Sequence, residues 1–242
     1  KAEKKTEKPK KAPKPKAPVE LTDYGFVAVC MGKGITNILK DLGVDRVIEG
    51  GQTMNPSTDD ILKAVKRVKA KTVYVFPNNK NIIMAANQAA ELVEDKKIVV
   101  IPSKSVPQCI SAMVEFNDKK SAEANEKAMN KAIGRVTSGQ LTYAVRDTEI
   151  DGIEIKKDDI LGMVEGKIVT VGKDIDDVLN RVVSQMVDED TEFLNVYYGK
   201  EIKKPQADVM LKALETKYAD DEIEVSFKKG GQPLYYYIIS AE

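Results

Sequence analysis

Apolar and amphipathic stretches alternate over residues 25–116. Short runs rich in β-branched residues, at 25–31, 45–49, 72–76 and 97–101, are each followed by a segment whose apolar residues recur at helical spacing. Within 57–68, for example, Ile61, Leu62, Val65 and Val68 share one face of a helix. Unbroken apolar strands that alternate with helices predict a parallel sheet with helices on both faces.

The pattern changes after a long predicted helix at 121–136. Residues 139–150, GQLTYAVRDTEI, alternate between apolar and polar, which predicts one strand with Arg146 and Asp147 on opposite faces. Turn signals follow at Asp151-Gly152 and Glu165-Gly166 and indicate antiparallel hairpins. We therefore expect an α/β protein with a parallel α/β lobe over 20–118, a connecting helix over 119–137 and a mixed α/β lobe over 138–242.

The first residues differ in composition from the rest. Residues 1–17 contain eight Lys and two Glu and carry a charge of +6; because the whole chain is neutral, the remaining residues carry −6. We expect residues 1–19 to be a disordered, basic and Pro-rich linker that follows another domain. The acidic remainder argues against a nucleic-acid partner.

The residue types that are missing narrow the chemistry. The chain has no His, which excludes His-based triads, His-based metal sites and the commonest general acid and base. Cys30 and Cys109 stand in apolar stretches without metal-type spacing, so we interpret them as reduced core thiols of a cytoplasmic protein. We expect no transmembrane segment and no secretory signal, because every apolar run is too short.

Four polar loops follow the predicted strands of the first lobe: 31–34 (MGKG), 50–58 (GGQTMNPST), 77–81 (PNNKN) and 102–105 (PSKS). In a parallel sheet all four leave the carboxyl-terminal edge, where open α/β sheets bind ligands, and each precedes a helix N-terminus that favours anions. Taken singly, Ser57, Asn81 and Ser105 are also ordinary helix caps. The candidate partner- or anion-binding residues are Gly51, Gln52, Thr53, Asn55, Ser57, Thr58, Asn78, Asn79, Lys80, Asn81, Lys104 and Arg146.

Motifs for nucleotides and metals do not match. GKGIT lacks the first half of a P-loop, and Asn37 stands where the third glycine of a dinucleotide fingerprint would follow Gly32 and Gly34. The acidic doublets fit solvated turns, and no spacing brings carboxylates together for Mg²⁺. We expect no catalytic residue, cofactor or metal in these residues.

Five separate stretches carry a family resemblance: IEGGQTMNPSTDDILKAV, FPNNKNIIMAANQAAEL, IPSKSVPQCISAM, SGQLTYAVRDTEIDGIEIKKDDILGMVEGKIV and GGQPLYYYIIS. They resemble the C-terminal domain of the bacterial fatty acid kinase A family, whose members are dihydroxyacetone-kinase-like proteins. The resemblance runs from about Tyr24 to Glu242 and implies a two-lobe DegV-like (EDD) fold.

The resemblance also implies a role. Members of this family phosphorylate a fatty acid carried by a separate fatty acid-binding protein B, and the acyl phosphate feeds phospholipid synthesis. ATP and Mg²⁺ are expected in an upstream nucleotide-binding domain of the same chain, while the C-terminal domain docks the carrier. The TMNPST loop is similar to a lipid-carboxylate loop of DegV-type proteins, which by analogy turns Thr53, Ser57 and Thr58 toward an anion. Dihydroxyacetone kinases hold their substrate on a histidine, which is missing here.

Two main hypotheses follow. The first is a non-catalytic domain that docks the fatty acid-binding partner of a two-component kinase. The alternative is a domain that itself binds a fatty acid or another small anion in the crevice between the lobes. A crevice filled by side chains favours docking, and an enzyme that acts alone is the least supported interpretation.

Overall fold

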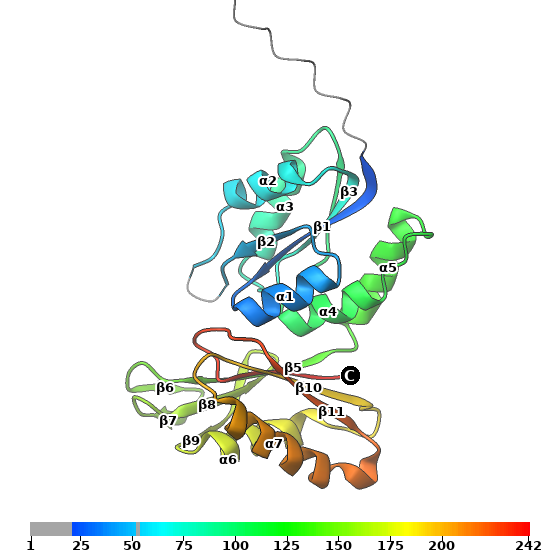
Figure 1. Cartoon of the computed structure of the whole chain (residues 1–242). Helices are drawn as coiled ribbons and strands as arrows, with labels where there is room; N and C mark the ends of the chain where they lie inside the picture. The colour runs from blue at the N-terminus through cyan, green and yellow to red at the C-terminus, as the bar shows by residue number, and fades with distance from the viewer. Residues whose placement is uncertain (1–20, 52–53) are drawn as a thin grey trace, which may run out of the picture.

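The computed structural model describes residues 21–51 and 54–242. The predicted linker over 1–19 and the candidate residues Gln52 and Thr53 lie outside the described residues. The remaining residues form two lobes, each built on one large sheet (Figure 1).

The first lobe contains a four-stranded parallel sheet in the order β2-β1-β3-β4. The apolar runs of the sequence form its strands, which are β1 (Thr22–Cys30), β2 (Arg46–Glu49), β3 (Ala70–Phe76) and β4 (Lys97–Val100). Its helices are α1 (Lys33–Asp41), α2 (Thr58–Arg67), α3 (Ile83–Glu91), α4 (Val106–Val114) and α5 (Ala122–Ile133). The predicted parallel α/β architecture is confirmed.

Helices cover both faces of this sheet. Ile61 and Val65 of α2 and Ala86 of α3 pack with the sheet on one side. On the other side Ile35 of α1 and Cys109 of α4 pack against it. Figure 1 shows α1 and α4 between the two lobes, with α2 and α3 on the far side of the first sheet.

The second lobe contains a six-stranded mixed sheet in the order β11-β10-β12-β5-β8-β9. Only the β10–β11 pair is parallel. The strands are β5 (Thr137–Tyr143), β8 (Ile160–Val164), β9 (Lys167–Gly172), β10 (Phe193–Tyr198), β11 (Glu224–Lys229) and β12 (Tyr237–Ala241). Helices α6 (Ile175–Met186) and α7 (Lys204–Lys217) and a 3₁₀ turn (Ala219–Asp221) complete the lobe.

The two lobes share buried apolar surface. Tyr197 of β10 and Ile238 of β12 belong to the same buried cluster as Ile35 and Cys109 of the first lobe. The opposite face of the second sheet packs on α6 and α7, with Val182 and Leu214 fully buried. Helices α1 and α4 are therefore enclosed between two sheets, and this holds the loops of the first lobe against the second.

Local sequence signals set several of these boundaries. Ser57 and Asp60 form the predicted capping box at the start of α2. The two predicted hairpin turns are present, and Glu165 and Gly166 both have the positive φ that such a tight turn requires. The prediction that Asn81 caps a helix is wrong: α3 begins at Ile83, and the backbone N–H of Asn81 instead donates to Asn79 Oδ1 at 2.9 Å.

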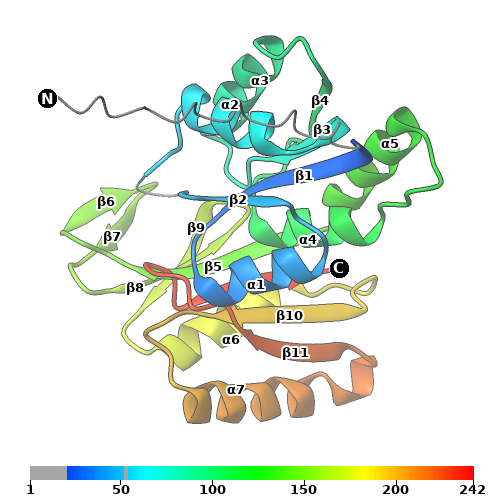
Figure 2. The ribbon, with the colours of Figure 1, turned by 45° about the horizontal axis from the view of Figure 1, so that its top comes forward.

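The single strand predicted over 139–150 is also wrong. Strand β5 ends at Tyr143. The N–H of Ala144 still donates to the Asp159 carbonyl, but its own carbonyl accepts the N–H of Asp158, so the regular pairing with β8 (Ile160–Val164) stops there. The chain then forms a separate hairpin of β6 (Thr148–Ile150) and β7 (Ile153–Ile155), which projects from the lobe in Figure 2. Arg146 therefore lies in an exposed bend and not on a strand face.

In the residues that the structure describes, no helix combines the length and apolar character needed to cross a membrane.

Candidate functional site

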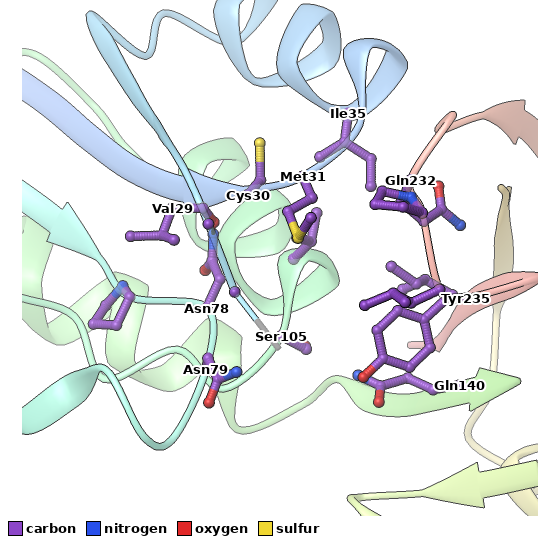
Figure 3. A pocket seen from close by; sticks show the side chains of 17 residues that line it. Val29, Cys30, Met31, Ile35, Asn78, Asn79, Ser105, Gln140, Gln232 and Tyr235 are labelled. Atoms are coloured by element: carbon purple, nitrogen blue, oxygen red, sulfur yellow. Dashed lines mark hydrogen bonds between the residues drawn. The ribbon is translucent and has the colours of Figure 1, made fainter. Parts of the chain in front are cut away.

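A crevice lies where the carboxyl-terminal edge of the first sheet faces the second lobe (Figure 3). Asn78, Asn79 and Ser105 come from loops of the first lobe, and Gln140 and Tyr235 stand opposite them on the second lobe. The loops after β1, β2, β3 and β4 all contribute, as their common departure from one edge predicts. We call the smaller part of this crevice the inner hole.

The inner hole is small. Met31 and Ile35 line it from the first lobe, and Leu234 and Tyr235 line it from the second. The space that remains is about 50 Å³, whereas sites for drug-sized ligands typically measure roughly 300–1,000 Å³. The inner hole has room for a few water molecules and none for a long acyl chain.

The MGKG loop contacts the other lobe. The backbone N–H of Ile35 donates to the carbonyl of Gly230 at 3.1 Å. A Cβ on Gly34 would overlap the Lys229 carbonyl oxygen, and one on Gly32 would lie 2.6 Å from the Gln232 nitrogen. The glycines therefore permit close backbone contact between the lobes, and the N-terminus of α1 faces a carbonyl instead of an open anion site.

A second, larger cavity of about 280 Å³ adjoins the inner hole, and we call it the outer groove. Its two linings share Asn79, Ser105, Gln140 and Tyr235. The outer groove also includes Lys80, Asn81 and Lys104 from the first lobe, together with Gln108, Ser138 and Glu165. Four of the sequence candidates, Asn79, Lys80, Asn81 and Lys104, are thus brought together here.

Buried hydrogen bonds hold the walls of the crevice. Asn78 adopts a positive φ of 56°; its Nδ2 donates to the Val29 carbonyl at 2.9 Å, and its Oδ1 accepts from Ser103 Oγ at 2.7 Å. Across the lobes, the hydroxyls of Ser105 and Ser138 lie 2.7 Å apart. Asn78 therefore supports the loop, while Asn79 is the amide that lines both cavities.

Other candidates lie elsewhere. Gly51 lines the inner hole, but Asn55 lines a separate surface depression beside Arg46 and Lys63. Ser57 Oγ donates to Asp60 Oδ2 at 2.6 Å, and Thr58 Oγ1 donates to Gln88 Oε1 at 3.1 Å. These two hydroxyls serve the start of α2.

Sequence patterns alone miss the second wall of the site. Gln140 stands on a strand and Glu165 in a hairpin turn. Gln232 and Tyr235 belong to GGQPLYYYIIS, which carries the family resemblance but no signal for a site. Gln108 on α4 of the first lobe is missed too, because it matches an ordinary helix-cap pattern. Their role in the crevice depends on how the lobes pack, which no local pattern encodes.

Burial keeps the Tyr235 phenol and the Cys30 thiol neutral. It raises the pKa of the Tyr235 phenol above its ordinary range, so the hydroxyl remains protonated. Burial also raises the pKa of the Cys30 thiol, and a contact with Thr36 partly offsets this. Within the described part of the chain, no group of three His, Cys, Asp or Glu residues could hold a metal ion. The site can therefore bind a ligand through hydrogen bonds and through the charges of Lys80 and Lys104.

Known proteins share both sequence and fold with this chain. Protein YloV of Bacillus subtilis (strain 168) is 50% identical over 219 residues, which are 90% of this chain and 39% of the relative. The chain thus spans about two fifths of that protein's length. Residues 25–242 also match the FakA-like C-terminal family of fatty acid kinase.

Solved structures confirm the two-lobe DegV-like fold. The structure of DegV, a fatty acid binding protein from Bacillus subtilis, has a TM-score of 0.62 at 13% identity and covers 91% of this chain and 99% of its own. The Streptococcus pneumoniae Fatty Acid Kinase (Fak) B3 protein loaded with linoleic acid has a TM-score of 0.54 at 11% identity, with 91% and 99% covered. At these identities the likeness extends to the fold alone. On the sequence match over residues 25–242, the chain belongs to the FakA-like C-terminal family of fatty acid kinase.

Proposed function

We propose that this chain is the docking domain of the kinase component of a two-component fatty acid kinase. In this proposal it holds a fatty acid-binding partner protein while other domains of the kinase phosphorylate the bound fatty acid for phospholipid synthesis. In this proposal those catalytic domains, with ATP and Mg²⁺, lie outside this chain, which spans about two fifths of the length of its relative. The chain itself performs no phosphoryl transfer and works in the cytoplasm.

One observation carries the proposal: the inner hole of the crevice has little free space. Proteins of similar fold are described as fatty acid-binding or as loaded with linoleic acid. Here only about 50 Å³ remains between Met31, Ile35 and Tyr235. A domain that keeps this fold inside a fatty acid kinase family, but has no space for an acyl chain, is better suited to bind the carrier than the lipid.

The family match supplies the kind of partner. A kinase whose substrate is held inside another protein needs a surface that positions that protein, since orientation of the reacting groups accounts for much of the rate. The polar loops at the carboxyl-terminal edge, which carry Lys80 and Lys104, provide an exposed surface for such contact. Arg146 is exposed in the bend after β5 and is a further candidate contact.

Isothermal titration of the whole 242-residue chain with purified carrier tests the proposal. We expect saturable heat with one carrier per chain and co-elution on gel filtration. Carrier preloaded with oleate and carrier stripped of lipid should both be compared, because a docking domain contacts the protein surface. No heat and no co-elution at about 50 μM of each protein would contradict docking in the affinity range of transient complexes.

The alternative function has a specific observation in its favour. The outer groove is polar and much larger than the inner hole. The volume of the inner hole weighs against a fatty acid, yet the outer groove accommodates a small anion. This second candidate requires no carrier and can be tested separately.

A further inference from the structure

Hydrogen-bond donors from two amide side chains line the outer groove. Asn79 is 5% exposed and Gln108 is 7% exposed, so both amides are almost fully buried in its wall. Asn79 Oδ1 accepts the Asn81 N–H at 2.9 Å, and Gln108 Oε1 accepts the Lys104 N–H at 2.7 Å. Each amide oxygen is therefore engaged by backbone, and this fixes which end of the side chain is NH₂.

The NH₂ ends of both side chains lack a protein partner among residues 21–51 and 54–242. In Figure 3 the nitrogen of Asn79 is on the side that faces Gln140 and Tyr235 across the gap. Neither nitrogen is among the fully buried polar atoms that lack a partner, so each is open to the groove. There it can donate to water or to a ligand oxygen.

Two cations stand at the rim of the same groove. Lys80 and Lys104 are exposed, and neither is in an ion pair with any described residue. Glu165 is the acid that lines the groove, and its Oε1 accepts the Ser138 N–H at 2.6 Å. Two ammonium groups against one engaged carboxylate leave a local positive excess in a chain whose residues after 17 carry −6.

Size restricts the ligand. The outer groove measures about 280 Å³ and adjoins the inner hole of about 50 Å³. An acceptor-rich head group fits the groove, but the inner hole has no space for an acyl tail. Amide NH₂ groups and lysines together favour an oxyanion, because ionised acceptors form the stronger hydrogen bonds.

We propose that the outer groove is a binding site for a small oxyanion, a carboxylate or a phosphate, without a long apolar tail. Asn79 and Gln108 donate to its oxygens, and Lys80 and Lys104 balance its charge. This deepens the second candidate function by naming the residues and the class of ligand. It does not depend on carrier docking.

The test exchanges each donor for an acceptor of the same shape. Asn79→Asp and Gln108→Glu keep the oxygen that the backbone engages and replace NH₂ by a second oxygen. The matched controls are Asn87→Asp on α3 and Gln185→Glu on α6, both exposed and outside the groove. Affinities for inorganic phosphate, acetate, hexanoate and palmitate are measured by NMR titration of the 242-residue chain, with sodium chloride as the ionic-strength control.

We expect phosphate or acetate to shift the signals of 79–81 and 104–108 saturably. Asn79→Asp and Gln108→Glu should each weaken binding by about tenfold or more, whereas the controls stay within about twofold. Comparing the affinities for phosphate and acetate shows whether the groove prefers a phosphate or a carboxylate. Hexanoate and palmitate should bind no more tightly than acetate.

Three results would overturn the proposal. The first is shifts no larger than those produced by chloride, and the second is equal losses in the groove variants and the controls. The third is palmitate binding more than about tenfold tighter than acetate, which would mean that the crevice opens to an acyl chain. If a buried-site variant does not fold, the exposed double variant Lys80→Met/Lys104→Met provides the same test, with weaker binding and a smaller salt dependence expected. Carrier binding by the same variants distinguishes failure of this site from failure of docking.

Discussion

The backbone N–H of Ile35, in the first turn of α1, donates to the carbonyl oxygen of Gly230 at 3.1 Å. This bond joins the two lobes through main-chain atoms that lie almost 200 residues apart in the sequence. It is possible only because Gly34 has no Cβ where the Lys229 carbonyl passes. The contact closes one side of the crevice and prevents α1 from presenting a free N-terminus to a ligand.

Gly34→Ala tests this contact. The added methyl group would overlap the Lys229 carbonyl oxygen, a backbone atom that cannot rotate away. We expect a loss of about 2 kcal/mol or more in the free energy of unfolding, measured with urea. Gly134→Ala is the matched control, because its Cβ would be 3.4 Å from the nearest atom; it should be neutral or stabilising by up to about 1 kcal/mol. Equal changes in the free energy of unfolding for the two substitutions would show that the contact between the lobes does not stabilise the fold.

The two thiols should be unreactive in the native protein. Burial raises the pKa of both Cys30 and Cys109, so the thiolate fraction near neutral pH is very small. Cys30 lines the inner hole but is only 3% exposed. We expect no reaction with a chromogenic aromatic disulfide reagent at about pH 8 until guanidinium unfolds the chain, and then reaction of both thiols. Rapid native-state labelling of Cys30 in a Cys109→Ala variant would mean that the crevice opens.

The capping box at α2 predicts a pH-dependent contribution to stability. Hydrogen bonds from the Ser57 side chain and backbone lower the pKa of Asp60 below its ordinary 3.8. A lowered native pKa stabilises the fold above the unfolded value, and this contribution is lost as the pH falls through the native pKa.

Ser57→Ala measures that contribution. It should cost about 1 kcal/mol in the free energy of unfolding at neutral pH. The difference from the unmodified chain should shrink as the pH falls from 3.8 through the lowered native pKa of Asp60. The measurement is a series of urea titrations across this range. A constant difference down to acid pH would contradict the assigned role of Asp60.

Local patterns predict most of the fold, because strands and helices here follow their hydrophobic periodicity. The four strands of the first sheet, the Ser57 cap and the turns at Asp151-Gly152 and Glu165-Gly166 all follow from residues within a few positions of each other. The end of β5 at Tyr143 does not, because it depends on an irregular bond from the Asp158 N–H to the Ala144 carbonyl, which lies 14 positions earlier in the sequence.

The candidate site is only half predictable from the sequence. The sequence predicts the loops that carry Asn79, Lys80 and Lys104, because the carboxyl ends of parallel strands lie at the same edge of a sheet. Gln140 and Tyr235 become part of the site only through the packing of the lobes. The small volume of the inner hole likewise results from that packing, since Met31 and Leu234 line it from opposite lobes.

The central claim is that the chain holds the carrier and not the lipid. The most direct measurement is gel filtration of the 242-residue chain mixed with carrier that has been loaded with radiolabelled oleate, beside a second run with free labelled oleate. The account predicts that label, carrier and chain elute together in the first run, and that no label elutes with the chain in the second. Label that moves onto the chain alone in either run, or a chain that elutes without carrier, would contradict it.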